Sequence, residues 1–109
     1  MDASIYLLDD SELALFEANQ KGYRNDVYVR IKHNYYKVNI YSYVRIVQDF
    51  ETEHAEYGYF SIDNNIVLVK EVTNEEIKSV LFNLIKQNYF ADVKPIDNNK
   101  ALELTFLEL

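Results

Sequence analysis

The clearest hydrophobic pattern in the chain lies near its middle and predicts an amphipathic helix. Between residues 74 and 86 the apolar side chains recur every three or four positions, which places them on one stripe of an α-helix: Ile77, Val80, Leu81, Leu84 and Ile85. Thr73 and Glu76 have the spacing of a capping box, and Lys86 suits the negative end of the helix dipole. We therefore expect a helix that starts after Thr73 and buries this stripe.

A second helix is expected near the N-terminus, after a short apolar segment at residues 4–8. Asp9 followed by Glu12 resembles a capping box, and Gly22 supplies a residue that tolerates the left-handed end of a helix. The sequence thus predicts a helix from about residue 10 to Lys21.

Alternation of apolar and polar residues predicts strands in most of the remaining chain. Val27 begins an alternating run, and residues 33–35 form a plausible turn. A longer run follows, with its apolar residues on one face (Val38, Ile40, Val44, Ile46) and mixed polar and aromatic residues on the other (Lys37, Asn39, Tyr41, Tyr43, Arg45). Turn residues at 63–65 separate residues 57–62 from 66–72, which predicts a hairpin, and the same Ile-Asp-Asn-Asn sequence at 96–99 predicts a second turn between strands at 93–96 and 101–109.

Together these elements predict a single α+β domain over residues 1–109. Its mostly antiparallel sheet would have about five to six strands, with two helices packed on one face. The length suits one domain, and only two Gly and one Pro leave little room for a linker.

Charge and composition restrict the classes of partner. The formal net charge is −7, which argues against nucleic-acid binding because that affinity comes from neutralised phosphates. No apolar stretch is long enough to span a bilayer, and the start of the chain has no features of a secretion signal. The absence of cysteine excludes disulfides and thiolate metal sites. We expect a cytoplasmic protein that contacts neither nucleic acid nor membrane, and its oligomeric state stays open.

The sequence contains no recognisable catalytic motif, so we expect no enzymatic activity, no metal and no cofactor. Serines lie in no nucleophile elbow, and two glycines cannot build a phosphate-binding loop. His54 lies between Glu53 and Glu56, but the spacing matches no zinc or calcium motif, and a solvated histidine is the simpler interpretation.

An acidic stretch threaded with aromatic residues is the best candidate for a functional surface. Residues 49–63 carry five carboxylates and no Lys or Arg. A concentrated negative field attracts basic partners, and tyrosines provide rigid contact area. The candidate partner-binding residues are Asp49, Glu51, Glu53, Glu56, Tyr57, Tyr59, Tyr41 and Tyr43.

The segment from Asp49 to Tyr59, in a small, acidic, cysteine-free chain, resembles the immunity proteins of bacterial toxin systems, including contact-dependent inhibition. The resemblance implies stoichiometric binding to a cognate toxin with a basic surface, such as a nuclease. One alternative is a phage or plasmid accessory protein that mimics nucleic acid or regulates a host enzyme. Another is a small-ligand-binding domain, for which the face of Tyr41, Tyr43 and Arg45 would be the place to look.

Overall fold

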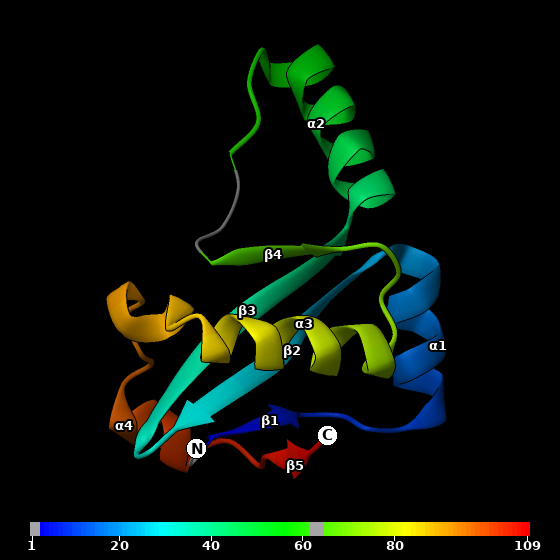
Figure 1. Ribbon diagram of the computed structural model, residues 1–109. Helices are drawn as coiled ribbons and strands as arrows, with labels where there is room; N and C mark the ends of the chain where they lie inside the picture. The colour runs from blue at the N-terminus through cyan, green and yellow to red at the C-terminus, as the bar shows by residue number, and fades with distance from the viewer. Residues whose placement is uncertain (1–2, 62–64) are drawn as a thin grey trace.

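The computed structural model describes residues 3–61 and 65–109, which form a sheet with helices around it (Figure 1). The strands are β1 (Ala3–Leu7), β2 (Tyr23–Ile31), β3 (Asn34–Ser42), β4 (Ile66–Val69) and β5 (Leu107–Glu108). The helices are α1 (Glu12–Lys21), α2 (Tyr43–Tyr57), α3 (Asn74–Lys86) and α4 (Asn98–Leu102), with a 3₁₀ turn η1 (Tyr89–Asp92).

The five strands form one mixed sheet in the order β4-β3-β2-β1-β5. All neighbours are antiparallel except β3 and β4, which run parallel and are connected through α2. The expected α+β class with a mostly antiparallel sheet is therefore confirmed, although the described residues form four helices instead of two.

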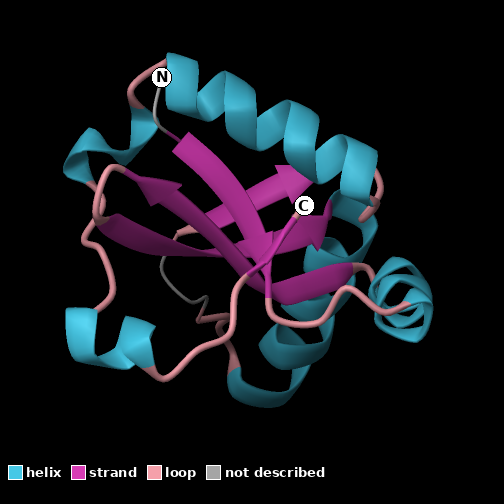
Figure 2. Cartoon of the chain, turned by 90° about the horizontal axis from the view of Figure 1, so that it is seen from below, coloured by secondary structure: helices cyan, strands magenta, loops and turns pink. Residues whose placement is uncertain are grey.

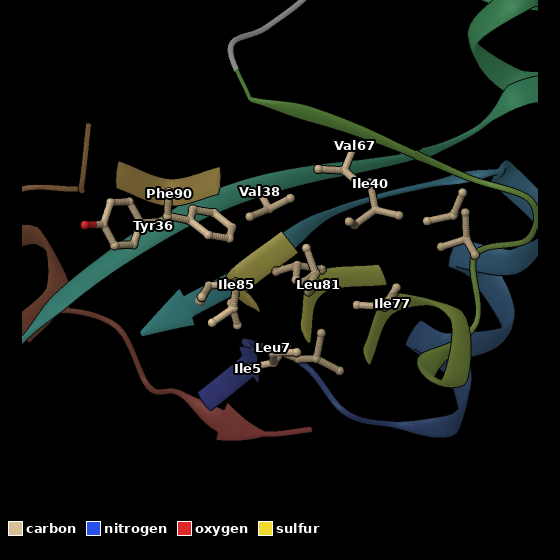
Figure 3. Packing of buried hydrophobic residues seen from close by; sticks show 14 of the residues in the cluster. Ile5, Leu7, Tyr36, Val38, Ile40, Val67, Ile77, Leu81, Ile85 and Phe90 are labelled. Carbon is tan, nitrogen blue, oxygen red and sulfur yellow. The ribbon is translucent and has the colours of Figure 1, made fainter. Parts of the chain in front are cut away.

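The hydrophobic core lies between one face of the sheet and α3 (Figure 3). Helix α3 contributes Ile77, Leu81 and Ile85, all at most 5% exposed, as its apolar stripe predicts. The Thr73 hydroxyl accepts a hydrogen bond from the Glu76 N–H, so the expected cap is present. The sheet contributes apolar residues of four strands: Ile5, Leu7, Val27, Val29, Val38, Ile40, Val67 and Val69. In Figure 2, α3 runs along one side of the sheet.

The opposite face of the sheet is covered in part by the C-terminal segment. Phe106 stacks on Tyr35 at 4.2 Å between ring centroids and contacts the rings of Tyr28 and Tyr6. Burial, and secondarily the negative charge of Asp26, raise the pKa of Tyr28 above its ordinary value.

The residue that caps the N-terminus of helix α1 lies two positions after the expected one, Asp9. Ser11 is the N-cap and accepts from the Ala14 N–H, whereas Asp9 accepts from the Ser11 N–H in the turn before the helix. Hydrogen bonding to Ser11, first to its backbone N–H and then to its side chain, lowers the pKa of Asp9. The helix ends at Gly22, which has a φ of 78° as expected for a left-handed cap.

Three strand predictions are wrong. Residues 43–46, for which the alternating pattern predicted a strand, form the start of helix α2, and residues 58–61 form no strand. Strand β4 pairs in parallel with β3, so it does not form the predicted hairpin with residues 57–62. Residue 62 and residues 63–64 of the predicted turn lie outside the described part of the chain. Residues 93–96 form no strand, and Asp97 caps α4 through the Asn99 N–H, so the second turn starts a helix.

Candidate functional site: a projecting helix with an apolar and acidic surface

Helix α2 projects from the body of the molecule. Figure 1 shows it rising from the end of β3 away from the sheet, and none of its fifteen residues is buried. A helix that connects two parallel strands ordinarily covers a face of their sheet. Here the described part of the chain buries no residue of the connecting helix.

Local sequence signals define both ends of α2. The Ser42 hydroxyl accepts from the Arg45 N–H and so caps the first turn. Gly58, with a φ of 82°, ends the helix and donates its N–H to the His54 carbonyl. Capping at both ends stabilises a helix that has little tertiary packing.

The base of α2 is fixed to the body by Arg45. Its guanidinium donates to the Lys21 carbonyl at 3.0 Å and to the Asp49 carboxylate at 2.9 Å, and it lies 4.9 Å from the centre of the Tyr23 ring. The Ser42 N–H donates to the Gly22 carbonyl at 2.7 Å. These contacts join the end of α1 to the start of α2, so they set the direction in which α2 projects.

One side of α2 carries an apolar and aromatic stripe. At 100° per residue its members fall within a sector of roughly 100°. They are Tyr43, Ile46, Val47, Phe50, His54 and Tyr57. The side chains of Tyr43, Phe50 and Tyr57 are 66%, 51% and 61% exposed. Phe50 stacks on His54 and contacts Phe60 at 6.2 Å, so the segment after the helix covers a part of the stripe.

Carboxylates lie on both sides of this stripe. Glu51 follows one edge, while Glu53, Glu56 and Asp49 follow the other by the same helical geometry. Glu51 and Glu56 are exposed and Glu53 is half-buried. Asp49 is engaged by Arg45, so its charge is partly neutralised within the chain. The stripe and its carboxylates together form the α2 surface.

The predicted tyrosines do not form one surface. Tyr41 is half-buried in β3 and stacks on Tyr23 at 5.6 Å, whereas Tyr43 lies at the start of α2. They were expected on one face of a strand, and the helix that begins after Ser42 separates them. Tyr59 lies beyond Gly58 and is 66% exposed. Tyr43, Tyr57 and the acidic residues are therefore brought together by α2, and Tyr41 is not part of it.

Sequence reasoning missed the apolar members of the α2 surface. Val44, Ile46 and Phe50 fit a strand as well as a helix, but Val47 follows Ile46 directly and fits only the helical spacing. Ser42 as a capping residue was the additional signal. Arg45 was expected on an open sheet face, and its role at the base of α2 depends on residues 20 positions or more before it.

Elsewhere the described residues show a few open hollows. One of them, with a volume of about 510 Å³, lies beside the start of β4 and is lined by residues of β3, η1 and the segment 93–96. Within residues 3–61 and 65–109 no group of three or more His, Asp or Glu side chains is arranged to hold a metal ion. His54 lies against Phe50. No helix of this part of the chain is long and apolar enough to cross a membrane.

Comparison with known proteins yields no relative from which a role could be transferred. No protein-family model matches the chain, and no curated protein and no solved structure shows significant similarity to it.

Proposed function

We propose that this protein is a stoichiometric binding protein whose α2 surface docks on a basic partner protein. The observation that carries the proposal is a fifteen-residue helix with no buried residue, an exposed aromatic stripe and flanking carboxylates. An amphipathic helix of this kind binds by placing its apolar stripe in a groove. Carboxylates on both sides of the stripe favour a groove with a basic rim.

The fixed direction of α2 supports this role. Because Arg45 and the caps at both ends hold the helix in the free protein, less conformational entropy would be lost when the partner binds. Large aromatic side chains provide the anchors that dominate interface energies.

More specifically, we propose that the partner is a bacterial toxin and that this protein is the immunity protein that neutralises it. A nuclease toxin binds the phosphates of its substrate with a basic surface, and the carboxylates of α2 would occupy that surface. A phage or plasmid accessory protein would use the same charge complementarity. Inhibition of a toxin encoded beside the gene for this protein would favour the immunity protein over the phage or plasmid accessory protein.

The decisive experiment is a titration of that toxin's purified catalytic domain with this protein. We expect inhibition to be complete at a one-to-one ratio, to be unaffected by EDTA, and to weaken as salt concentration rises because exposed charges are screened. Inhibition at substoichiometric amounts would point to turnover and would contradict the proposal.

Charge reversal tests whether α2 is the surface involved. One variant changes three carboxylates of the α2 surface to lysine: Glu51, Glu53 and Glu56. A matched control changes three acidic residues outside α2, all of them exposed: Asp10, Asp92 and Glu103. Both variants have the same net charge, so long-range attraction changes equally. We expect association to be at least tenfold slower in the α2 variant than in the control, and equal rates would refute the assignment.

A further inference from the structure

A second contact surface is the outer edge of the sheet at β4. This strand is the last in the order β4-β3-β2-β1-β5, and among the described strands only β3 pairs with it. The Asn39 N–H donates to the Asn65 carbonyl, which fixes the phase of the parallel ladder. Residues 65, 67 and 69 therefore direct their backbone groups toward β3. Ile66 and Leu68 direct theirs outward.

These outward groups have no hydrogen-bond partner within the described part of the chain. The side chain of Leu68 is 50% exposed, and the strand Ile66–Val69 contains neither a charge nor a proline. An edge strand of this composition is open to pairing with another chain, apart from the protection given by its short length and the adjacent Lys70.

The chemistry of this edge identifies its occupant as an extended polypeptide segment. Alternating N–H and C=O groups are complementary only to the backbone of another strand, and the exposed Leu68 favours an apolar side chain beside it. A second copy of this chain is a poor occupant. Two four-residue strands bury far less than the roughly 1,200 Å² of a stable interface. The acidic α2 of each copy would also repel the other.

The position of β4 relative to α2 connects the two surfaces. Figure 1 shows α2 rising beyond this edge of the sheet, from the end of β3 that pairs with β4. A partner in contact with α2 is therefore placed within reach of the β4 edge.

We propose that the partner which docks on α2 also adds an extended segment to the outer edge of β4. This inference rests on the proposed function, because β4 alone offers too few hydrogen bonds for stable binding. The partner would combine a groove for the α2 stripe with a strand that pairs with Ile66 and Leu68. Hydrogen bonds between the partner's strand and β4 would fix the orientation of the partner, and contacts with the α2 surface would provide most of the affinity.

Amide hydrogen exchange tests the edge directly. In the free protein we expect the Leu68 amide to exchange at least tenfold faster than the Val67 and Val69 amides, which donate to β3. Comparable protection of all three would show that the edge is already covered and would overturn the inference. With the toxin catalytic domain bound, the Leu68 amide should slow by at least tenfold. An unchanged Leu68 amide in a complex that forms through α2 would overturn the inference and leave the proposed function standing.

Two substitutions at one position separate backbone pairing from side-chain contact. Leu68→Pro removes the outward N–H without removing a donor to β3, and proline is tolerated on an exposed edge. Leu68→Ala shortens the side chain and keeps the N–H. We expect Leu68→Pro to weaken binding of the toxin domain at least tenfold more than Leu68→Ala. Equal affinities would overturn the inference, and absence of any complex with the wild-type protein would refute both proposals. If Leu68→Pro fails to fold, exchange in the wild-type complex decides the matter.

Discussion

Substitution of Gly22 by alanine tests how α2 is attached to the body. Gly22 has a φ of 78°, and a Cβ atom added there would lie 2.8 Å from both the Arg45 Cβ and the Ser42 Oγ. Gly58 offers a matched comparison, because its φ is 82° but no atom of the described residues lies within 4 Å of its added Cβ. Both glycines end a helix, so the pair separates backbone strain from crowding.

The expected magnitudes follow from these two contributions. A left-handed conformation costs a residue with a Cβ about 1–2 kcal/mol, and restriction of the unfolded chain offsets about 0.4–1 kcal/mol of this. Gly58→Ala should therefore lower the free energy of unfolding by about 1 kcal/mol. At Gly22 the added Cβ must displace Arg45 or Ser42, and overpacking of this kind costs a further 1–3 kcal/mol or so. Gly22→Ala should destabilise by about 2–4 kcal/mol.

The assay is urea unfolding of the two variants and the wild type, followed by far-ultraviolet circular dichroism. An NMR comparison of the Gly22→Ala variant should also show shifts for Arg45 and Tyr23, because the displaced side chain loses its place over the ring. Equal destabilisation by the two substitutions would refute the close approach of α1 and α2, and with it the argument that α2 projects in a fixed direction.

Two further predictions concern the body of the fold. Leu81→Ala should lower the free energy of unfolding by roughly 2–5 kcal/mol, because Leu81 is fully buried under the sheet. Leu102→Ala, at a position that is 85% exposed, should lower it by less than about 0.5 kcal/mol. Similar urea midpoints for the two variants would contradict the burial of Leu81 in the core. Because the pKa of Tyr28 is higher in the folded than in the unfolded state, its contribution to stability is complete below the unfolded pKa and is lost as pH rises through the folded one. Tyr28→Phe should therefore make the free energy of unfolding fall less steeply above about pH 10 than in the wild type, and an unchanged slope in urea titrations would contradict the burial of its hydroxyl.

The elements that local sequence determines are those predicted correctly. Helix α3 is specified by the Thr73 cap and by an apolar stripe that only a helix can bury on one side, so no distant residue is needed to predict it. The alternation of β2 and β3 likewise predicts an antiparallel pair. The carboxylates and aromatic side chains at 49–60 also predict a candidate binding surface from the sequence alone, and most of this segment lies on α2.

The tertiary structure decided where those side chains lie. Val44 and Ile46 satisfy a strand and a helix equally, and the helix is anchored by contacts of Arg45 with Lys21 and Tyr23, more than 20 residues away. Turn residues at 63–65 favour a hairpin locally, but β4 pairs with β3 because that register buries Val67 and Val69 in the core. Sequence alone thus indicated the acidic and aromatic segment as a candidate binding surface. Long-range contacts decided that its side chains project on a helix beside an open sheet edge, since strand pairing and helix direction depend on residues distant in the chain.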